Sequence, residues 1–164
     1  MSTQLSQVQS KHFKLKQLAD GVYAAIHVDG GWLICNAGIV DLGNRTLVFD
    51  TGITPQAARD LRVAAKVLTG QTPDYVVNSH YHNDHIRGNQ VFPKAVVVST
   101  MRTLELIITK GLEELNSDRK QTPENLAEMK TWAKSRDAKK RKEAGFWLPY
   151  WQGIWACLLY TSPS

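Results

Sequence analysis

The stretch Asn78-Ser79-His80-Tyr81-His82-Asn83-Asp84-His85 decides the fold, and it directly follows the apolar run Tyr75-Val76-Val77. Three of the five histidines of the chain lie within its last six residues, together with one aspartate. On an extended backbone, side chains two residues apart leave the same face, so His80 and His82 should point to one place. Asp84 and His85 follow where the chain must turn, and should point to a neighbouring place.

Imidazole and carboxylate groups are the ligands that suit zinc and related divalent ions. A pair of histidines beside an adjacent Asp-His pair is the arrangement that a two-metal site needs, with the ions roughly 3.5–4 Å apart. The alternative is that these are polar loop residues without a special role. Three histidines and an aspartate at this density, at the end of a strand that is apolar enough to be buried, favour a metal site.

The pattern His80-x-His82-x-Asp84-His85 resembles the signature of the metallo-β-lactamase superfamily. Two flanking segments are also similar to that family: Leu47-Val48-Phe49-Asp50-Thr51-Gly52 before the pattern and Gly88-Asn89 after it. The resemblance covers residues 21–100. It implies an α/β fold of the α+β type, here a partial αββα sandwich made of the first-half sheet and its flanking helices.

The same resemblance implies a dinuclear zinc hydrolase in the full-length parent. His80 and His82 would hold the first ion, and Asp84 and His85 the second. A hydroxide held by the metal would attack an ester, thioester or amide of a small-molecule substrate, and Asp84 would orient that nucleophile and relay its proton. Asp50 would support a ligand from the second shell, or it would instead cap the following helix.

The sequence departs from the family after His85, because no further histidine follows. The first ion would therefore keep two protein ligands, fewer than the three that are usual for catalytic zinc. We consequently expect a truncated and inactive fragment of a hydrolase. Two alternatives stay open: a nucleic-acid-processing phosphodiesterase of the same fold, and a fragment that binds metal without catalysis.

The composition sets further limits on the class of protein. The chain has 164 residues, is 43% hydrophobic and carries a net charge of +5, which suits one globular core. It contains no apolar run long enough to span a membrane and no pattern of a secretory leader, so we expect a cytoplasmic protein without a membrane partner. The sequence makes no prediction of its oligomeric state.

The ends of the chain are expected to lie outside the domain. Residues 1–18 are polar and predict a flexible lead-in. Residues 157–164 resemble a translated sequencing adapter, so we expect a non-native tail and set the domain at residues 19–156.

Between these ends the hydrophobic periodicity predicts alternating strands and helices. Strands are expected at residues 22–28, 32–40, 46–49, 74–79 and 95–99, and a helix at 54–70 that Thr54 caps. Two further helices are expected, one from Met101 and one from Thr122 to Lys142.

The run Lys139-Lys140-Arg141-Lys142 allows two interpretations. It could be a nucleic-acid contact, or it could be the carboxyl end of a helix, where the helix dipole favours cations. No aromatic residue is interleaved with these charges to stack on bases. The sequence therefore favours the helix end, and we expect no nucleic-acid-binding residues. The aromatic cluster at residues 146–155 is expected to belong to the core.

Overall fold

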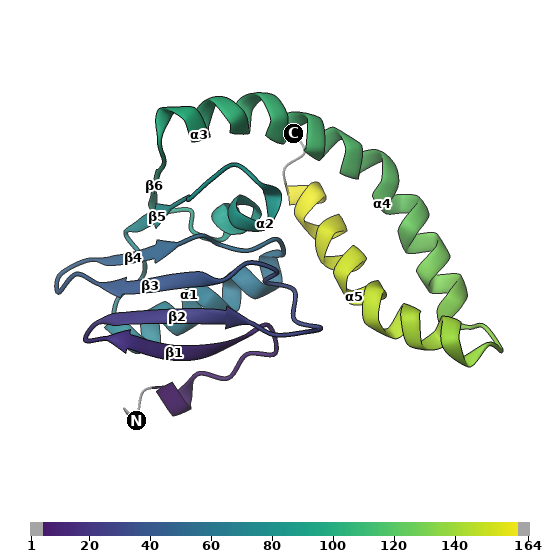
Figure 1. Ribbon diagram of the computed structural model, residues 1–164, viewed down its shortest axis with the longest axis horizontal. Coiled ribbons are helices and arrows are strands. Elements are labelled where there is room, and N and C mark those ends of the chain that lie inside the picture. The colour runs from purple at the N-terminus through teal and green to yellow at the C-terminus, as the bar shows by residue number, and fades with distance from the viewer. Residues whose placement is uncertain (1–4, 161–164) are drawn as a thin grey trace.

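A computed structural model describes residues 5–160, and it contains one six-stranded mixed sheet with helices beside it (Figure 1). The strands follow one another in sequence order across the sheet. They are β1 (Phe13–Ala19), β2 (Val22–His27), β3 (Ala37–Asp41), β4 (Thr46–Phe49), β5 (Tyr75–Val77) and β6 (Val96–Val98). The first four strands pair antiparallel, whereas β4, β5 and β6 pair parallel. The predicted α/β fold class is confirmed.

The helices occupy the second half of the chain, apart from one that follows β4. They are α1 (Pro55–Thr69), α2 (Asn83–Ile86), α3 (Met101–Leu106), α4 (Leu112–Ala133) and α5 (Ala138–Tyr160), with short 3-10 segments at Leu5–Gln7 and Arg87–Val91 and a π-helical segment at Ile107–Gly111. Among the described residues, no helix is both long and apolar enough to cross a membrane.

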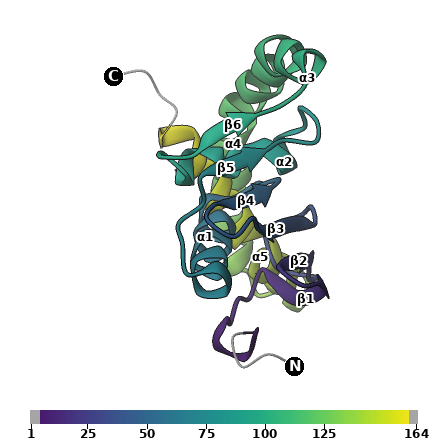
Figure 2. The ribbon, with the colours of Figure 1, turned by 90° about the vertical axis from the view of Figure 1, so that its left-hand side faces the viewer.

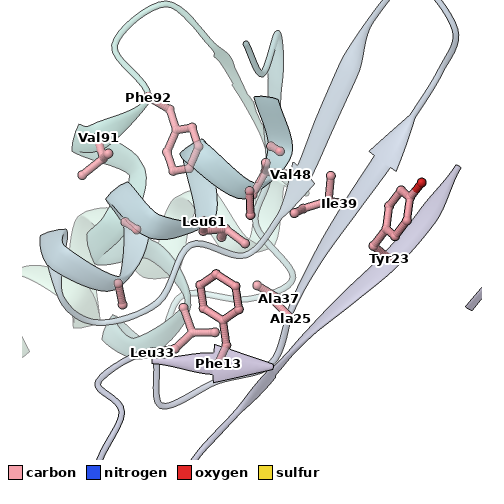
Figure 3. Close-up of a cluster of buried hydrophobic side chains, with 14 of the residues drawn as sticks. Phe13, Tyr23, Ala25, Leu33, Ala37, Ile39, Val48, Leu61, Val91 and Phe92 are labelled. Atoms are coloured by element: carbon pink, nitrogen blue, oxygen red, sulfur yellow. The ribbon is translucent and has the colours of Figure 1, made fainter. Parts of the chain in front are cut away.

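Helix α1 covers one face of the sheet, where the main hydrophobic core lies (Figure 2, Figure 3). Its start is set as the sequence predicts, because the Thr54 hydroxyl accepts a hydrogen bond from the amide of Ala57 and Pro55 occupies the first turn. Its alanines and leucines pack on the inward side chains of the strands, such as Ile39 and Val48. Gly70 ends it in a left-handed conformation.

The opposite face of the sheet is apolar but open. Two rows of paired residues cross it from β2 to β6: Val22, Val40, Leu47, Tyr75 and Val96 in one row, and Ala24, Gly38, Phe49, Val77 and Val98 in the other. Phe49 is 41% exposed and Val96 is 60% exposed, so this face is not covered as the α1 face is.

The first correction concerns the amino-terminal lead-in. Residues 13–18 were expected to be loose, but they belong to β1 (Phe13–Ala19), which pairs with β2 along its length. Phe13 is buried in the core, whereas most of the other residues of this strand are polar and exposed. The alternation in Phe13-Lys14-Leu15-Lys16 is that of an edge strand.

The strand predicted at residues 32–40 is also shorter in the structure, because β3 begins only at Ala37. Ile34 has a φ of 69°, which no extended strand allows. The amide of Trp32 donates to Nδ1 of His12, and the amide of Ile34 donates to Nδ1 of His27. Side-chain partners thus replace strand pairing in this loop.

The helices differ from prediction in two places. No helix begins at Thr122, because α4 runs through Pro123 without a break. A proline inside a helix removes one hydrogen bond, a cost that packing of α4 along α5 offsets. The basic run lies in the first turns of α5 and not at the carboxyl end of a helix, so that interpretation is wrong.

Helix α5 also continues into the segment that was expected to be a non-native tail. Cys157 and Leu158 lie in its last turns and are buried. The rest of that segment, residues 161–164, and the start of the lead-in, residues 1–4, lie outside the described residues.

Candidate metal-binding site

The candidate site lies at the edge of the sheet where two parallel strands end together. Strand β4 pairs with β5 so that Phe49 stands opposite Val77, and both chains then leave the sheet. Asp50 follows the first strand and Asn78 the second. Polar residues at the carboxyl ends of adjacent parallel strands meet at one edge, which is where α/β proteins place their ligands.

Asp50 connects the two strand ends and is almost fully buried. Its carboxylate accepts hydrogen bonds from the amide of Ser79 at 2.8 Å and from the Ser79 hydroxyl at 2.7 Å. A third contact joins it to Nδ1 of His85 at 2.7 Å. Asp50 has a φ of 57°, a conformation that a non-glycine residue adopts at a cost and that occurs often at functional sites.

Of the two roles that the sequence left open for Asp50, the structure rules out the capping of the following helix, and the support of a metal ligand stays a prediction. Helix α1 is capped by Thr54, whose hydroxyl also donates to the carbonyl of Trp32 at 2.8 Å. Asp50 instead holds the loop that carries the histidines. We call residues 78–85 the His-rich loop.

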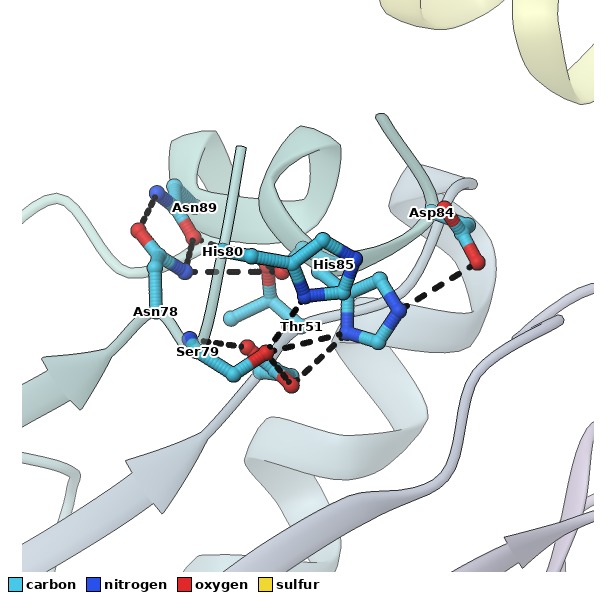
Figure 4. Close-up of polar contacts among 8 residues, drawn as sticks. Thr51, Asn78, Ser79, His80, Asp84, His85 and Asn89 are labelled. Atoms are coloured by element: carbon cyan, nitrogen blue, oxygen red, sulfur yellow. Dashed lines mark hydrogen bonds and ion pairs between the residues drawn. The ribbon is translucent and has the colours of Figure 1, made fainter. Parts of the chain in front are cut away.

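The three histidine rings of the His-rich loop lie against one another (Figure 4 shows two of them). The ring centroids of His80 and His85 are 4.0 Å apart, and those of His80 and His82 are 4.8 Å apart. His80 and His85 are half-buried, whereas His82 is exposed. The sequence prediction that these side chains converge on one surface agrees with this geometry.

The tautomer of His85 follows from its partners. Because the Asp50 carboxylate only accepts, a neutral His85 carries its proton on Nδ1 and leaves a lone pair on Nε2. That Nε2 lies 3.4 Å from a carboxylate oxygen of Asp84, which is a second acceptor. Two acceptors that face each other need a proton or a cation between them. This is the arrangement expected of two ligands that share one ion.

The pKa of His80 is lowered, first by partial burial and then by the neighbouring rings of His85 and His82. A lowered pKa keeps this imidazole neutral, which is the form that binds metal. Its Nδ1 lies 2.9 Å from the Ser79 hydroxyl, so Nε2 is the atom left for another ligand.

A network of backbone and amide contacts fixes the far end of the loop. The carbonyl of His85 accepts two hydrogen bonds from Thr51, one from the amide at 2.9 Å and one from the hydroxyl at 3.1 Å. The side-chain amides of Asn78 and Asn89 exchange hydrogen bonds at 2.7 and 3.2 Å, and Asn89 also accepts from the Thr51 hydroxyl. A Cβ at Gly88 would lie 2.1 Å from the carbonyl oxygen of Thr51, so only glycine fits there.

Asn78 is the residue of this network that sequence reasoning did not single out. Its only sequence signal is a polar residue at the end of an apolar strand. The pairing with Asn89 depends on a turn between them that no local pattern specifies.

Imidazole and carboxylate donors suit zinc, but in this structure the donor atoms of the His-rich loop do not converge on a single ion position. Within residues 5–160, no group of three or more His, Cys, Asp or Glu side chains is placed to hold a metal ion. Cys35 interacts electrostatically with Asp50 and Asp84, but its thiol does not supply the missing metal ligand. Burial first, and then those two carboxylates, raise its pKa to about 12, so it stays a protonated thiol and a poor ligand.

Fold and loop together define an α/β protein with imidazole and carboxylate side chains at the carboxyl edge of its sheet. A family model described as the metallo-beta-lactamase superfamily matches residues 30–146. That range is more than half of the chain, so the protein belongs to the metallo-β-lactamase superfamily. No curated protein matches it in sequence.

Several solved structures share the fold. A metallo-β-lactamase from Erythrobacter litoralis is 20% identical with a TM-score of 0.54, over 63% of this chain and 48% of its own. The metallo-β-lactamase FIM-1 from Pseudomonas aeruginosa, solved in a mono-zinc form, is 15% identical with a TM-score of 0.52, over 60% of this chain and 46% of its own. The sec-alkylsulfatase Pisa1 from Pseudomonas sp. is 20% identical with a TM-score of 0.52, over 67% of this chain and 18% of its own.

The chain therefore spans about half the length of the metallo-β-lactamases that it resembles. At these identities the likeness establishes the fold alone. The activity and the substrate are matters for proposal.

Proposed function

We propose that the His-rich loop is the metal-binding part of a zinc-dependent hydrolase site. The observation that carries this proposal is the Asp50–His85–Asp84 series, in which a buried carboxylate orients an imidazole whose free nitrogen faces a second carboxylate. Metal-bound histidines characteristically donate their other nitrogen to such a carboxylate. Membership of the metallo-β-lactamase superfamily supports the same conclusion.

Each residue of the loop has a proposed role. His80 and His82 would hold one zinc ion, and Asp84 and His85 a second. Bound zinc supplies a Lewis acid that makes water nucleophilic near neutral pH and stabilises negative charge on the substrate. Asp84 lies beside His85 and is half-buried, so it is placed to orient a water molecule and to accept its proton.

The proposed substrate class is a small molecule with an ester, thioester or amide bond. Structures with this fold include enzymes named as β-lactamases and as an alkylsulfatase, so the fold does not select among these bonds. The chain presents two imidazoles for the first ion, fewer than the three protein ligands usual for catalytic zinc. We therefore propose that these 164 residues alone bind zinc weakly and hydrolyse substrate slowly or not at all.

Zinc content tests this proposal independently of activity. The chain is equilibrated with zinc, dialysed against a fixed free concentration and measured by mass spectrometry, alongside His82→Ala and the control variant His27→Ala. His27 lies on β2, and its Nδ1 accepts from the amide of Ile34, outside the His-rich loop. We expect His82→Ala to lose bound zinc and His27→Ala to retain it. Equal zinc content in all three proteins would refute the proposed site.

Hydrolysis is then measured with p-nitrophenyl acetate and a thioester. Any turnover should disappear with a chelator, return with zinc and be absent from His82→Ala. Turnover that survives both treatments would show that the metal site is not responsible for it.

A further inference from the structure

A second polar cluster lies at the turn between α4 and α5, far from the sheet (Figure 1). Residues 130–142 contain seven Lys and Arg and one Asp, whereas the rest of the chain contains thirteen Lys and Arg and fourteen Asp and Glu. The whole positive charge of the protein is therefore concentrated here. We call residues 130–142 the basic tip.

The fold uses few of these charges to stabilise itself. The basic run occupies the first turns of α5, where the helix dipole is unfavourable to cations. Asp137 caps that helix, accepting from the amide of Lys139 at 2.8 Å. Arg141 donates to the carbonyls of Ser135 and Arg136, which leaves it structural.

The remaining cations of the basic tip are available to a partner. Within residues 5–160, no ion pair forms at five of its exposed side chains, namely Lys130, Lys134, Arg136, Lys139 and Lys142. Seven positive charges held on two adjacent helices and the turn between them repel one another. A ligand with closely spaced negative charges would relieve that repulsion.

The structure also brings an aromatic ring to the basic run, which contains no aromatic residue of its own. Trp132 reaches the basic tip from α4, and the ammonium of Lys140 lies 5.5 Å from the centroid of its ring. The ring is half-buried, so part of it stays open. Ala138 is the one aliphatic residue between 134 and 142, so this part of the basic tip lacks the apolar face of a helix that lies on a lipid surface.

We propose that the basic tip binds single-stranded nucleic acid, with its free cations on successive phosphates and Trp132 against a base. Grooves that bind single strands combine these two features: cations that follow the backbone and aromatic rings that stack on bases. The surface is separate from the His-rich loop, so it does not depend on the function proposed for that loop.

Fluorescence anisotropy with a labelled 20-nucleotide oligo(dT) and the full chain tests this proposal. With four phosphate contacts, raising the salt from 50 to 200 mM should weaken binding about 50-fold. The triple variant Arg136→Gln, Lys139→Gln, Lys142→Gln should bind more than about tenfold more weakly at 50 mM salt, and its slope of log affinity against log salt should be shallower by about 2.

The control removes the same charge elsewhere. Lys14, Lys16 and Lys94 are exposed and lie outside the basic tip, so their triple replacement by Gln should change affinity by less than about twofold. Trp132→Leu should weaken binding about tenfold without changing the salt slope, and Trp132→Phe should recover most of the loss.

Three results would overturn the proposal: equal weakening in both triple variants, unchanged binding in the basic-tip variant, or binding to phosphatidylserine vesicles without binding to the oligonucleotide. The last result would identify the basic tip as a membrane contact. Circular dichroism of each variant checks that the helices are intact.

Discussion

The His-rich loop and the basic tip are both dense polar clusters, but the protein builds them differently. In the loop, a buried carboxylate, a threonine and two asparagines fix the backbone and the ring of His85. In the basic tip, most cations lie on two helices and the turn between them and form no ion pair within residues 5–160. The difference indicates that the loop is organised for a compact ligand with fixed geometry, whereas the basic tip suits an extended ligand that is held by charge.

The largest effect that we predict is on thiol reactivity beside the loop. With its pKa raised to about 12, Cys35 should react with iodoacetamide at pH 8 about a thousandfold more slowly than an unperturbed thiol, because only the thiolate reacts. The raised pKa stabilises the native state below the unfolded pKa, and this contribution is lost as the pH rises through 12. Mass spectrometry of labelled peptides measures the rate of Cys35 alkylation in the native protein and in the protein unfolded in urea, and the ratio of the two rates tests the prediction.

Rapid native labelling of Cys35 would show that the carboxyl edge is open to solvent and that the loop is less fixed than we describe. Cys157 provides an internal comparison, since burial raises its pKa as well.

Removing the carboxylate that orients the loop should weaken metal binding. We expect Asp50→Ala to lower zinc affinity 10- to 100-fold, because an imidazole that lacks its partner is neither oriented nor held in one tautomer. The matched control is Asp74→Asn, whose carboxylate accepts from the amide of Thr46 and from Arg45 at the other end of the parallel strands. A competition titration with a zinc-sensitive dye would measure both variants, and equal affinities would contradict the role of Asp50.

The amide network beneath the loop should contribute to stability. Asn78 is buried and bonded to Asn89, so Asn78→Ala should cost about 1–3 kcal/mol of unfolding free energy by removing the acceptor of the Asn89 side-chain NH2 group. Asn44→Ala, in an exposed turn, should cost less than about 0.5 kcal/mol. Urea unfolding followed by circular dichroism compares the two, and similar costs would show that the network does not hold the loop.

The smallest effect is expected at the basic tip. Replacing Arg136, Lys139 and Lys142 with Gln should leave the free energy of unfolding within about 0.5 kcal/mol of the wild type, because these side chains are exposed and form no ion pair in the part of the chain that the structure describes. Thermal unfolding in low and moderate salt measures this difference. A clear loss of stability would mean that the charges support the fold, and that the contrast with the His-rich loop is false.

The sequence predicted the parts of this protein that depend on short-range patterns. Thr54, Pro55 and the spacing of the alanines and leucines predict helix α1. Each of these signals acts within a few residues. The His-rich loop is equally local, since its ligand residues are close neighbours in the chain.

The errors arose where distant contacts decide the structure. Strand β1 is specified by pairing with β2, and in the sequence only the short alternation from Phe13 to Lys16 signals it. The basic run was assigned to a helix end because Pro123 suggested a helix start, whereas packing between α4 and α5 carries the helix through that proline. The approach of Lys140 to Trp132 likewise depends on the hairpin that these two helices form.

The measurement that tests the metal site most directly is a zinc titration of the wild-type chain and of the double variant His80→Ala, His82→Ala by isothermal calorimetry. We predict saturable binding by the wild type, weaker than the roughly 10–16 kcal/mol of structural zinc sites, because the donors are close but not gathered around one point. The double variant should lose this binding while its helical circular dichroism stays unchanged. Zinc binding of equal affinity and stoichiometry in both proteins would contradict the assignment of the His-rich loop as the metal site.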